Sequence, residues 1–289
     1  MPVSKIAIVT DSTASLSPDE VAALGNVYVV PITFTINNNI YPEGIGMSND
    51  EFYALLPTLT KLPTTAPPTP QMMLSLYDDL VEKGYDQIIS IHLTAGITGF
   101  VDNLRMFTQY YEGAQIVVYD SHMALTPMGY QVKTAAKMAK ENKSLDQIIA
   151  KLDQLRASMG VFFVVDDLKN LVTGGRLSKT GALAGGLLKI KPILTLSKDS
   201  HQIIPIGKIR TMKKALTNIE ERFKAIYEKS TQPLHVMFMG TNNVSALEKW
   251  AADFKTRFPD VSTEIDEIGP VIGTHVGTNA FALSWINES

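Results

Sequence analysis

The sequence predicts an α/β protein of two domains, an N-terminal one with a Rossmann-like parallel sheet and helices, and a C-terminal one with a mixed or antiparallel sheet. The chain has 289 residues, and single hydrophobic cores rarely grow beyond ~250–300 residues. In roughly the first half, short apolar segments alternate with segments of helical periodicity, which favours a parallel sheet. After Val161, two short strands follow each other as a hairpin-like pair. We therefore expect domains at residues 1–157 and 158–289.

Composition and charge restrict the class of function. The net charge is −3 and no basic run is longer than Lys213-Lys214, which disfavours nucleic-acid binding and a DNA-binding regulator. The absence of cysteine excludes disulfides and thiolate metal sites. The N-terminal apolar run is too short for a signal peptide, and no window approaches ~18 uncharged apolar residues. We expect a cytoplasmic protein that is not inserted in a membrane.

Strands of the first half end in small polar residues, where open α/β sheets bind their ligands. The predicted strand Lys5–Thr10 leads directly into Asp11-Ser12-Thr13. The predicted strand Gln87–Leu93 leads into Thr94–Gly99, a glycine-rich turn before a helix. Backbone N–H groups of such a turn can hold an anion. Two more strands are expected, at Val27–Phe34 and Gln115–Tyr119.

Local signals define several helix starts and one loop. Capping boxes are predicted to begin helices at four serines, namely Ser17, Ser48, Ser144 and Ser245. The segment Pro63–Pro70 contains four prolines and three threonines. Because proline lacks an N–H donor and fixes φ, we expect a rigid loop that carries hydroxyl groups.

The segment after Val161 organises the second domain. A buried strand is followed by Asp166-Asp167, which we expect to open a short helix that Gly174-Gly175 ends. Arg176 lies at this turn and can anchor an anion. Gly181–Leu188 carries no charge, three glycines and two alanines. A helix of such small residues allows a close approach, either by another helix or by an apolar ligand.

Familiar catalytic motifs are missing from the chain. The Walker A pattern, G-x-S-x-G and H-x-x-x-H pairs do not occur. Loop hydroxyls, Arg176 and His275 remain as candidates, and these groups can bind one end of an anion. His275 lies in the glycine-flanked segment Pro270–Gly277. As alternatives, Arg176 caps helix carbonyls and His275 is a core histidine.

Several segments resemble the DegV family of bacterial fatty-acid-binding proteins, which includes the FakB subunits of fatty acid kinase. They occur in the family's order and read KIAIVTDSTASLS, PTTAPPTP, ITGF, DDLKNLVTGGRLS, LLKIKPIL, KIRTMKKAL and THVG. The resemblance implies a fatty acid between two α/β domains, with its carboxylate bound by hydroxyls of the first loop and of the glycine-rich turn. The positions carried over are Thr65, Thr98, Arg176 and His275, and Thr94 and Gly99 belong to the same turn as Thr98.

The resemblance also implies a function. The chain is expected to be a carrier without catalysis or cofactor, which presents a long-chain fatty acid to an ATP-dependent kinase subunit for acyl-phosphate formation in phospholipid metabolism. The sequence departs from the family at Ala66, Pro67 and Ala95, where polar residues are usual. The alternative is a stand-alone enzyme that acts on a small phosphorylated or carboxylated substrate at Asp11-Ser12-Thr13.

Overall fold

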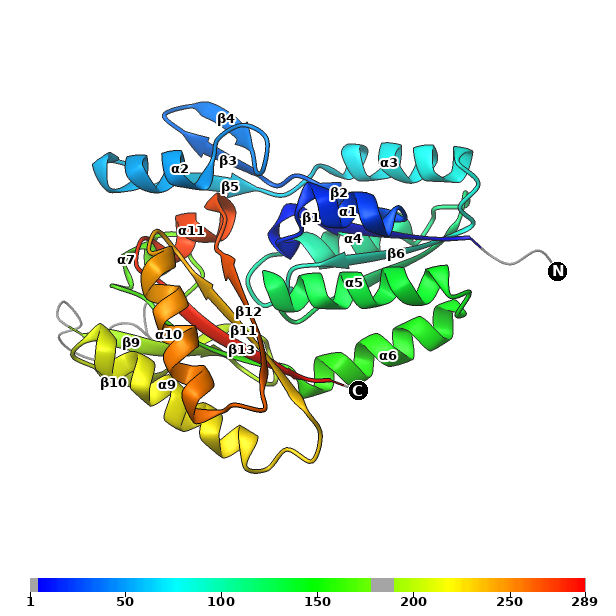
Figure 1. The fold of residues 1–289 in the computed structure, drawn as a ribbon. Coiled ribbons are helices and arrows are strands. Elements are labelled where there is room, and N and C mark those ends of the chain that lie inside the picture. Colours follow the sequence, from blue (N-terminus) through cyan, green and yellow to red (C-terminus); the bar gives the residue numbers. More distant parts are fainter. Residues whose placement is uncertain (1–4, 178–189, 289) are drawn as a thin grey trace. The chain divides into compact units, whose positions relative to one another are not determined.

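A computed structural model describes residues 5–177 and 190–288 of the chain. They form two compact units, one of residues up to Thr33 with Ala66–Ala157, and one of Phe34–Thr65 with the chain from Ser158 onward. The first unit holds a parallel sheet and the second a mixed sheet, which confirms the predicted fold class (Figure 1). Residues 34–65 thus group with the second unit.

The first unit is built on a four-stranded parallel sheet of order β2-β1-β6-β7. Both central strands are almost wholly buried, as expected for a parallel sheet covered on both faces. The strands are β1 (Ile6–Asp11), β2 (Val27–Val30), β6 (Gln87–His92) and β7 (Gln115–Asp120). The helices are η1 (Ser12–Ala14), α1 (Pro18–Leu24), α3 (Pro70–Glu82), α4 (Phe100–Thr108), α5 (Thr126–Lys140) and α6 (Leu145–Ser158).

The second unit is built on a six-stranded sheet of order β10-β9-β8-β13-β11-β12. Only β11 and β12 pair in parallel, and the other neighbours are antiparallel. The strands are β8 (Gly160–Val164), β9 (Lys191–Leu196), β10 (Ile203–Ile209), β11 (Leu234–Gly240), β12 (Ser262–Glu267) and β13 (Phe281–Asn287). The helices are α7 (Lys169–Thr173), α9 (Met212–Tyr227), α10 (Val244–Arg257) and α11 (Pro270–Val276).

The segment Phe34–Thr65 adds a small three-stranded sheet of order β4-β3-β5. It contains β3 (Thr33–Ile36), β4 (Asn39–Pro42), α2 (Asn49–Leu55), η2 (Leu56–Thr58) and β5 (Thr64–Ala66). The prediction of one strand over Val27–Phe34 was wrong, because β2 ends before Pro31 and β3 begins after it. The predicted loop from Pro63 contains β5, which is an edge strand flanked by prolines, as the missing proline donors require.

Most predicted helix starts are confirmed. Ser17 and Ser48 form capping boxes with the glutamates three residues later, and Ser144 bonds Gln147 in the same way. The prediction for Ser245 was wrong. Helix α10 begins two residues earlier, because the side chain of Asn243 accepts a hydrogen bond from the N–H of Ala246 at 3.2 Å, and asparagine is an equally good N-cap.

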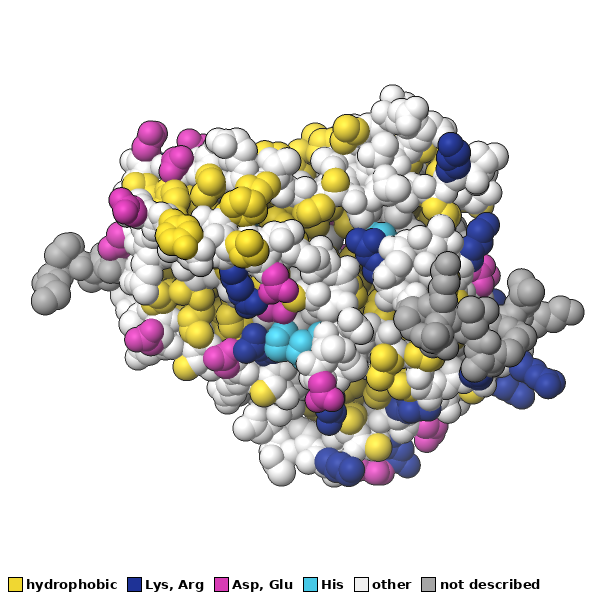
Figure 2. Space-filling view, turned by 180° about the vertical axis from the view of Figure 1, so that it is seen from behind, with side chains coloured by type: hydrophobic (Ala, Val, Ile, Leu, Met, Phe, Trp, Pro, Cys, Tyr) yellow, Lys and Arg dark blue, Asp and Glu magenta, His cyan; other side chains and the backbone are white. Residues whose placement is uncertain are grey.

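Three observations concern the distribution of basic side chains, membrane-spanning helices and metal ligands. On the face shown in Figure 2, the described Lys and Arg side chains stand in small groups separated by other residues, not in one continuous basic surface. No helix in residues 5–177 or 190–288 is long and apolar enough to cross a bilayer. The same residues contain no group of three or more His, Asp or Glu side chains placed to hold a metal ion.

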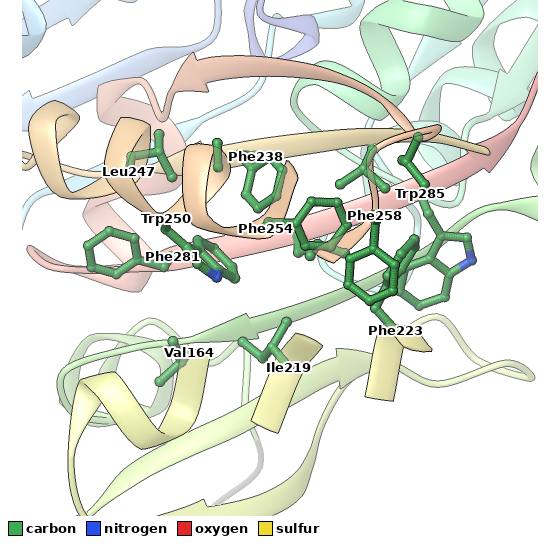
Figure 3. Packing of buried hydrophobic residues seen from close by; sticks show 14 of the residues in the cluster. Val164, Ile219, Phe223, Phe238, Leu247, Trp250, Phe254, Phe258, Phe281 and Trp285 are labelled. Carbon is green, nitrogen blue, oxygen red and sulfur yellow. The ribbon is translucent and has the colours of Figure 1, made fainter. Parts of the chain in front are cut away.

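The core of the second unit lies between the six-stranded sheet and the helices α9 and α10, which pack on its strands (Figure 3). Aromatic rings dominate it. Phe223 of α9 lies 5.2 Å from Phe254 and 5.3 Å from Phe258 between ring centroids, and 6.2 Å from Trp285 of β13. Both tryptophans of the chain, Trp250 and Trp285, belong to this cluster. Their fluorescence therefore reports on the second unit.

We expect Phe223→Ala to destabilise the second unit by about 3–5 kcal/mol, because it removes a fully buried ring and leaves a cavity. The measurement is denaturant unfolding followed by tryptophan fluorescence. Ile204→Ala is the control, since the Ile204 side chain on β10 is 39% exposed, and it should change stability by less than about 1 kcal/mol. A loss for Phe223→Ala as small as that of the control would contradict this account of the core.

Candidate functional site

The segment Phe34–Thr65 is attached to the first turn of α11. Glu43 accepts a hydrogen bond from the N–H of Val271 at 2.8 Å, at the positive end of the helix. Tyr53 donates its hydroxyl hydrogen to the carbonyl of Ile268 at 2.6 Å. Asn49 donates to the carboxylate of Glu267 at 2.9 Å. These contacts fix the segment that ends at Thr65 against the helix that carries His275.

Helix α7 packs against the last turn of α11. The side chain of Asn170 donates to the carbonyl of Thr274 at 3.0 Å. Gly174 lies so close to His275 that a Cβ atom at this position would meet the ring Nδ1 at 2.7 Å. The predicted end of the helix at Gly174-Gly175 is confirmed. Its predicted start was wrong, because α7 begins only at Lys169, whose N–H bonds the carboxylate of Asp167 at 2.7 Å.

Thr65 and His275 meet although they are 210 residues apart in the sequence. The distance from Thr65 Oγ1 to His275 Nε2 is 3.0 Å, a hydrogen bond. His275 lies in the last turn of helix α11, and Gly277 ends this helix. Both side chains line a cavity of about 590 Å³ within the second unit.

The cavity also contains Arg176. Its guanidinium is half-buried and donates to the carbonyl of Gly174 at 2.6 Å, so Arg176 does cap the end of α7 while it lines the cavity. Burial lowers the pKa of Arg176 from its ordinary value. The described lining residues include cations and hydroxyls but no carboxylate, and they are Leu59, Thr60, Lys61, Leu62, Pro63, Thr64, Thr65, Lys169, Asn170, Thr173, Gly174, Arg176, Thr274 and His275.

His275 is neutral at physiological pH. Burial lowers the pKa of its ring from 6.5 to about 4, and the positive charge of Arg176 acts in the same direction. The ring Nδ1 is buried and has no hydrogen-bond partner among the described residues. A neutral imidazole with Nδ1 unpaired can carry its one proton on Nε2, where Thr65 accepts it.

The glycine-rich turn Thr94–Gly99 lies in the first unit and joins β6 to α4. Thr94 is fully buried, and its hydroxyl accepts a hydrogen bond from the N–H of Gly96 at 3.1 Å. Thr98 accepts from the N–H of Phe100 at 3.3 Å, which leaves the Thr98 hydroxyl its own hydrogen to donate. Gly99 is the N-cap of α4. A ligand-binding role of Thr94, Thr98 and Gly99 stays a prediction.

The Asp11-Ser12-Thr13 turn was the expected site of the alternative enzyme. Its side chains form hydrogen bonds with other groups of the protein. Asp11 is fully buried and accepts from Thr13 Oγ1 at 2.5 Å and from His92 Nδ1 at 2.9 Å. His92 Nε2 in turn lies 2.7 Å from Ser90 Oγ. This connectivity resembles a Ser-His-Asp triad, but Ser90 is buried and also bonds the hydroxyl of Tyr77 at 2.8 Å. The buried groups offer no surface to a substrate, and they stabilise the strand ends.

The sequence missed several residues of the cavity. Lys61 belongs to no motif, and Lys169 and Asn170 lie in the family segment DDLKNLVTGGRLS but were not singled out. Only the fold brings them to the cavity that His275 lines. The attachment through Glu43 has no local signal either, because its partner is 228 residues away. Gly181–Leu188, the predicted small-residue helix, lies outside the described residues.

The described residues form two α/β units, and the second contains a cavity lined by cationic side chains and hydroxyls. A family model described as an uncharacterised protein of the DegV family matches residues 5–288. A DegV domain-containing protein of Listeria monocytogenes is 41% identical over 282 residues, which cover 97% of this chain and 98% of the relative. The chain therefore belongs to the DegV family.

Solved structures agree with this assignment. DegV of Bacillus subtilis, described as a fatty acid binding protein, superposes with a TM-score of 0.88 at 32% identity, covering 99% of this chain and all of that one. A fatty acid binding DegV family protein of Streptococcus agalactiae gives a TM-score of 0.90 at 29% identity, with coverage of 99% and 100%.

We predict that the NMR chemical shifts of the carbon-bound ring protons of His275 follow a titration with a pKa near 4. Neutral His275 then contributes free energy of unfolding that is fully present above pH 6.5 and is lost as the pH falls from 6.5 through about 4. The contribution is on the order of 3 kcal/mol. His275→Gln identifies the resonance and should reduce the loss of stability over this range.

Arg176→Gln is a second test of the same pair. It removes the nearby positive charge, so the pKa of His275 should rise, while burial should still keep it below 6.5. A His275 resonance that titrates near pH 6.5 in the unmodified protein would contradict the buried, neutral ring.

Proposed function

We propose that the protein binds a long-chain fatty acid and holds its carboxylate in the cavity at Thr65 and His275. The observation that carries this proposal is the Thr65–His275 hydrogen bond beside Arg176, in a cavity with no carboxylate among its described lining residues. The solved relatives described as fatty acid binding support the choice of ligand.

In this proposal the neutral ring of His275 donates from Nε2 to Thr65 Oγ1. The hydroxyl of Thr65 is then free to donate its own hydrogen to a carboxylate oxygen. A hydrogen bond to a charged acceptor is about twice as strong as one between neutral groups. Arg176 supplies the fixed positive charge, because its partner in the structure is the neutral carbonyl of Gly174.

In this proposal the apolar acyl chain of the fatty acid supplies most of the binding free energy. Burial gains ~0.8 kcal/mol per CH₂ group, so about 14 methylenes gain on the order of 11 kcal/mol before the cost of association. An ionised carboxylate buried without partners would cancel much of this gain. The donors at Thr65 and Arg176 remove that penalty.

We further propose that the protein is a carrier and not an enzyme, without a cofactor of its own. It presents the bound fatty acid to a separate ATP-dependent kinase, which forms the acyl phosphate for phospholipid metabolism. The Thr94–Gly99 turn contributes the second set of carboxylate contacts, through Thr98.

Native mass spectrometry of the purified protein tests this function. A co-purified species heavier than the chain by a few hundred daltons, identified as a fatty acid after extraction, is the expected result. A protein without lipid that turns over a small phosphorylated or carboxylated substrate would instead favour the stand-alone enzyme.

We expect Thr65→Val to weaken fatty-acid binding by roughly 1–2 kcal/mol, about tenfold. The substitution keeps the β-branched shape that suits a strand but removes the donor. Melting of the ligand-free protein should change little, since one partly exposed hydrogen bond contributes only ~1 kcal/mol. Isothermal titration with palmitic acid measures the affinity.

Thr263→Val is the matched control, because Thr263 also lies on a strand of the second unit but does not line the cavity. The Thr263→Val variant should bind palmitic acid with the same affinity as the unmodified protein. Thr98→Val, measured in the same way, tests the turn. Unchanged affinity in either Thr65→Val or Thr98→Val would remove that residue from the site.

A further inference from the structure

The turn Thr94–Gly99 of the first unit uses several of its backbone donors internally. The N–H of Gly96 bonds the hydroxyl of Thr94 at 3.1 Å, and the N–H of Ile97 bonds the carbonyl of Thr94 at 3.2 Å. The hydroxyl of Thr98 keeps its own hydrogen to donate. The contribution of this turn to a carboxylate site therefore depends on where the backbone places the Thr98 side chain.

Two contacts from the end of β7 and the segment after it hold the start of this turn. The N–H of Thr94 bonds the carbonyl of Met123 at 2.8 Å. The N–H of Ala95 bonds the carboxylate oxygen Oδ2 of Asp120 at 3.2 Å. Asp120 is the last residue of β7 and pairs in register with His92, the last residue of β6. Its side chain thus connects the carboxyl ends of two neighbouring strands.

The carboxylate of Asp120 is itself held in place. Asp120 is buried, and its second oxygen, Oδ1, accepts from the N–H of His122 at 2.9 Å. The ring Nε2 of His122 lies 3.9 Å from Oδ2, which is beyond hydrogen-bonding distance. Arg156 donates to the backbone carbonyl of Asp120 at 2.9 Å. The carboxylate therefore has a defined position from which it holds Ala95.

The bond from Ala95 to Asp120 is of the stronger kind, because its acceptor is ionised. A hydrogen bond to a charged acceptor is about twice as strong as one between neutral groups. Without the carboxylate, the N–H of the partly buried Ala95 loses this acceptor and the turn gains conformational freedom. A ligand that needs one conformation of the turn would then bind more weakly, because binding must order the turn first.

We propose that Asp120 is a positioning residue for fatty-acid binding, because its carboxylate fixes the turn at Ala95 and thereby places the hydroxyl of Thr98 for the carboxylate of the ligand. This inference rests on the proposed function, in which Thr98 contacts the fatty acid. Asp120 does not touch the ligand, and its effect on affinity is exerted through Thr98.

A double-mutant cycle tests this mechanism by isothermal titration with palmitic acid. Asp120→Asn keeps the shape of the side chain, but the N–H of Ala95 then faces either a neutral oxygen or an NH₂ group that cannot accept. We expect Asp120→Asn to weaken palmitate binding by about fivefold. In a Thr98→Val background the same substitution should weaken binding by less than about twofold, because the hydroxyl that Asp120 positions is gone.

Asp86→Asn is the matched control, because the carboxylate of Asp86 also accepts a backbone N–H, that of Lys5 at 2.7 Å. Asp86 directly precedes β6, so it lies at the opposite end of this strand from the turn. Asp86→Asn should leave the palmitate affinity unchanged. Melting followed by circular dichroism checks that each variant is folded, since both tryptophans lie in the second unit.

Amide hydrogen exchange in the unmodified protein is a second measurement, which does not depend on how the variants fold. Coupling between two equilibria is reciprocal. If the bond between Asp120 and Ala95 favours palmitate binding, palmitate must favour that bond. The exchange rate of the Ala95 amide, measured by NMR, should fall by about fivefold when palmitate saturates the protein. The Gln115 amide, which bonds the carbonyl of Asp86 at 3.0 Å, should change by less than about twofold.

Four results would overturn the proposal. Asp120→Asn could bind palmitate as tightly as the unmodified protein, or Asp86→Asn could lose as much affinity as Asp120→Asn. The loss from Asp120→Asn could be equally large in the Thr98→Val background, which would mean that Asp120 does not act through Thr98. Exchange of the Ala95 amide could be unaffected by palmitate. Each of these leaves fatty-acid binding intact, whereas failure of the unmodified protein to bind palmitate would contradict the proposed function itself.

Discussion

The attachment of the Phe34–Thr65 segment to helix α11 is the constraint on which the cavity depends. The carboxylate of Glu43 bonds the N-terminus of this helix, and Thr65, at the end of the same segment, reaches His275 in its last turn. The helix has only seven residues, so both ends are fixed within two turns. The contact at Glu43 thus helps to hold Thr65 beside the histidine.

The described lining of the cavity contains cationic side chains and no carboxylate. Arg176 is half-buried with a neutral carbonyl as its partner. Burial lowers the pKa of His275 to about 4, and the positive charge of Arg176 acts in the same direction. Folding therefore leaves a positive potential without a negative partner in the described lining. In the proposed function, an anionic ligand would supply the missing negative charge.

The sequence predicted the fold class well, because alternating strand and helix patterns and capping boxes at Ser17 and Ser48 are local signals. It failed where two nearby residues could both cap a helix. The N-cap of α10 is Asn243 and not Ser245. The role of Glu43 and the placement of Lys61 and Lys169 depend on contacts between distant segments, which periodicity does not encode. Loop hydroxyls and His275 were candidates from the residues alone, and the family resemblance selected Thr65 among the hydroxyls. The meeting of Thr65 and His275 at 3.0 Å required the structure.

The most direct test of the account is a crystal structure of the protein with a bound fatty acid. The account predicts a carboxylate oxygen within about 2.7–3.2 Å of Thr65 Oγ1, with His275 Nε2 still bonded to that hydroxyl and the guanidinium of Arg176 beside it. A fatty acid whose carboxylate lies away from Thr65 and His275, with the cavity of the second unit left unused, would contradict it.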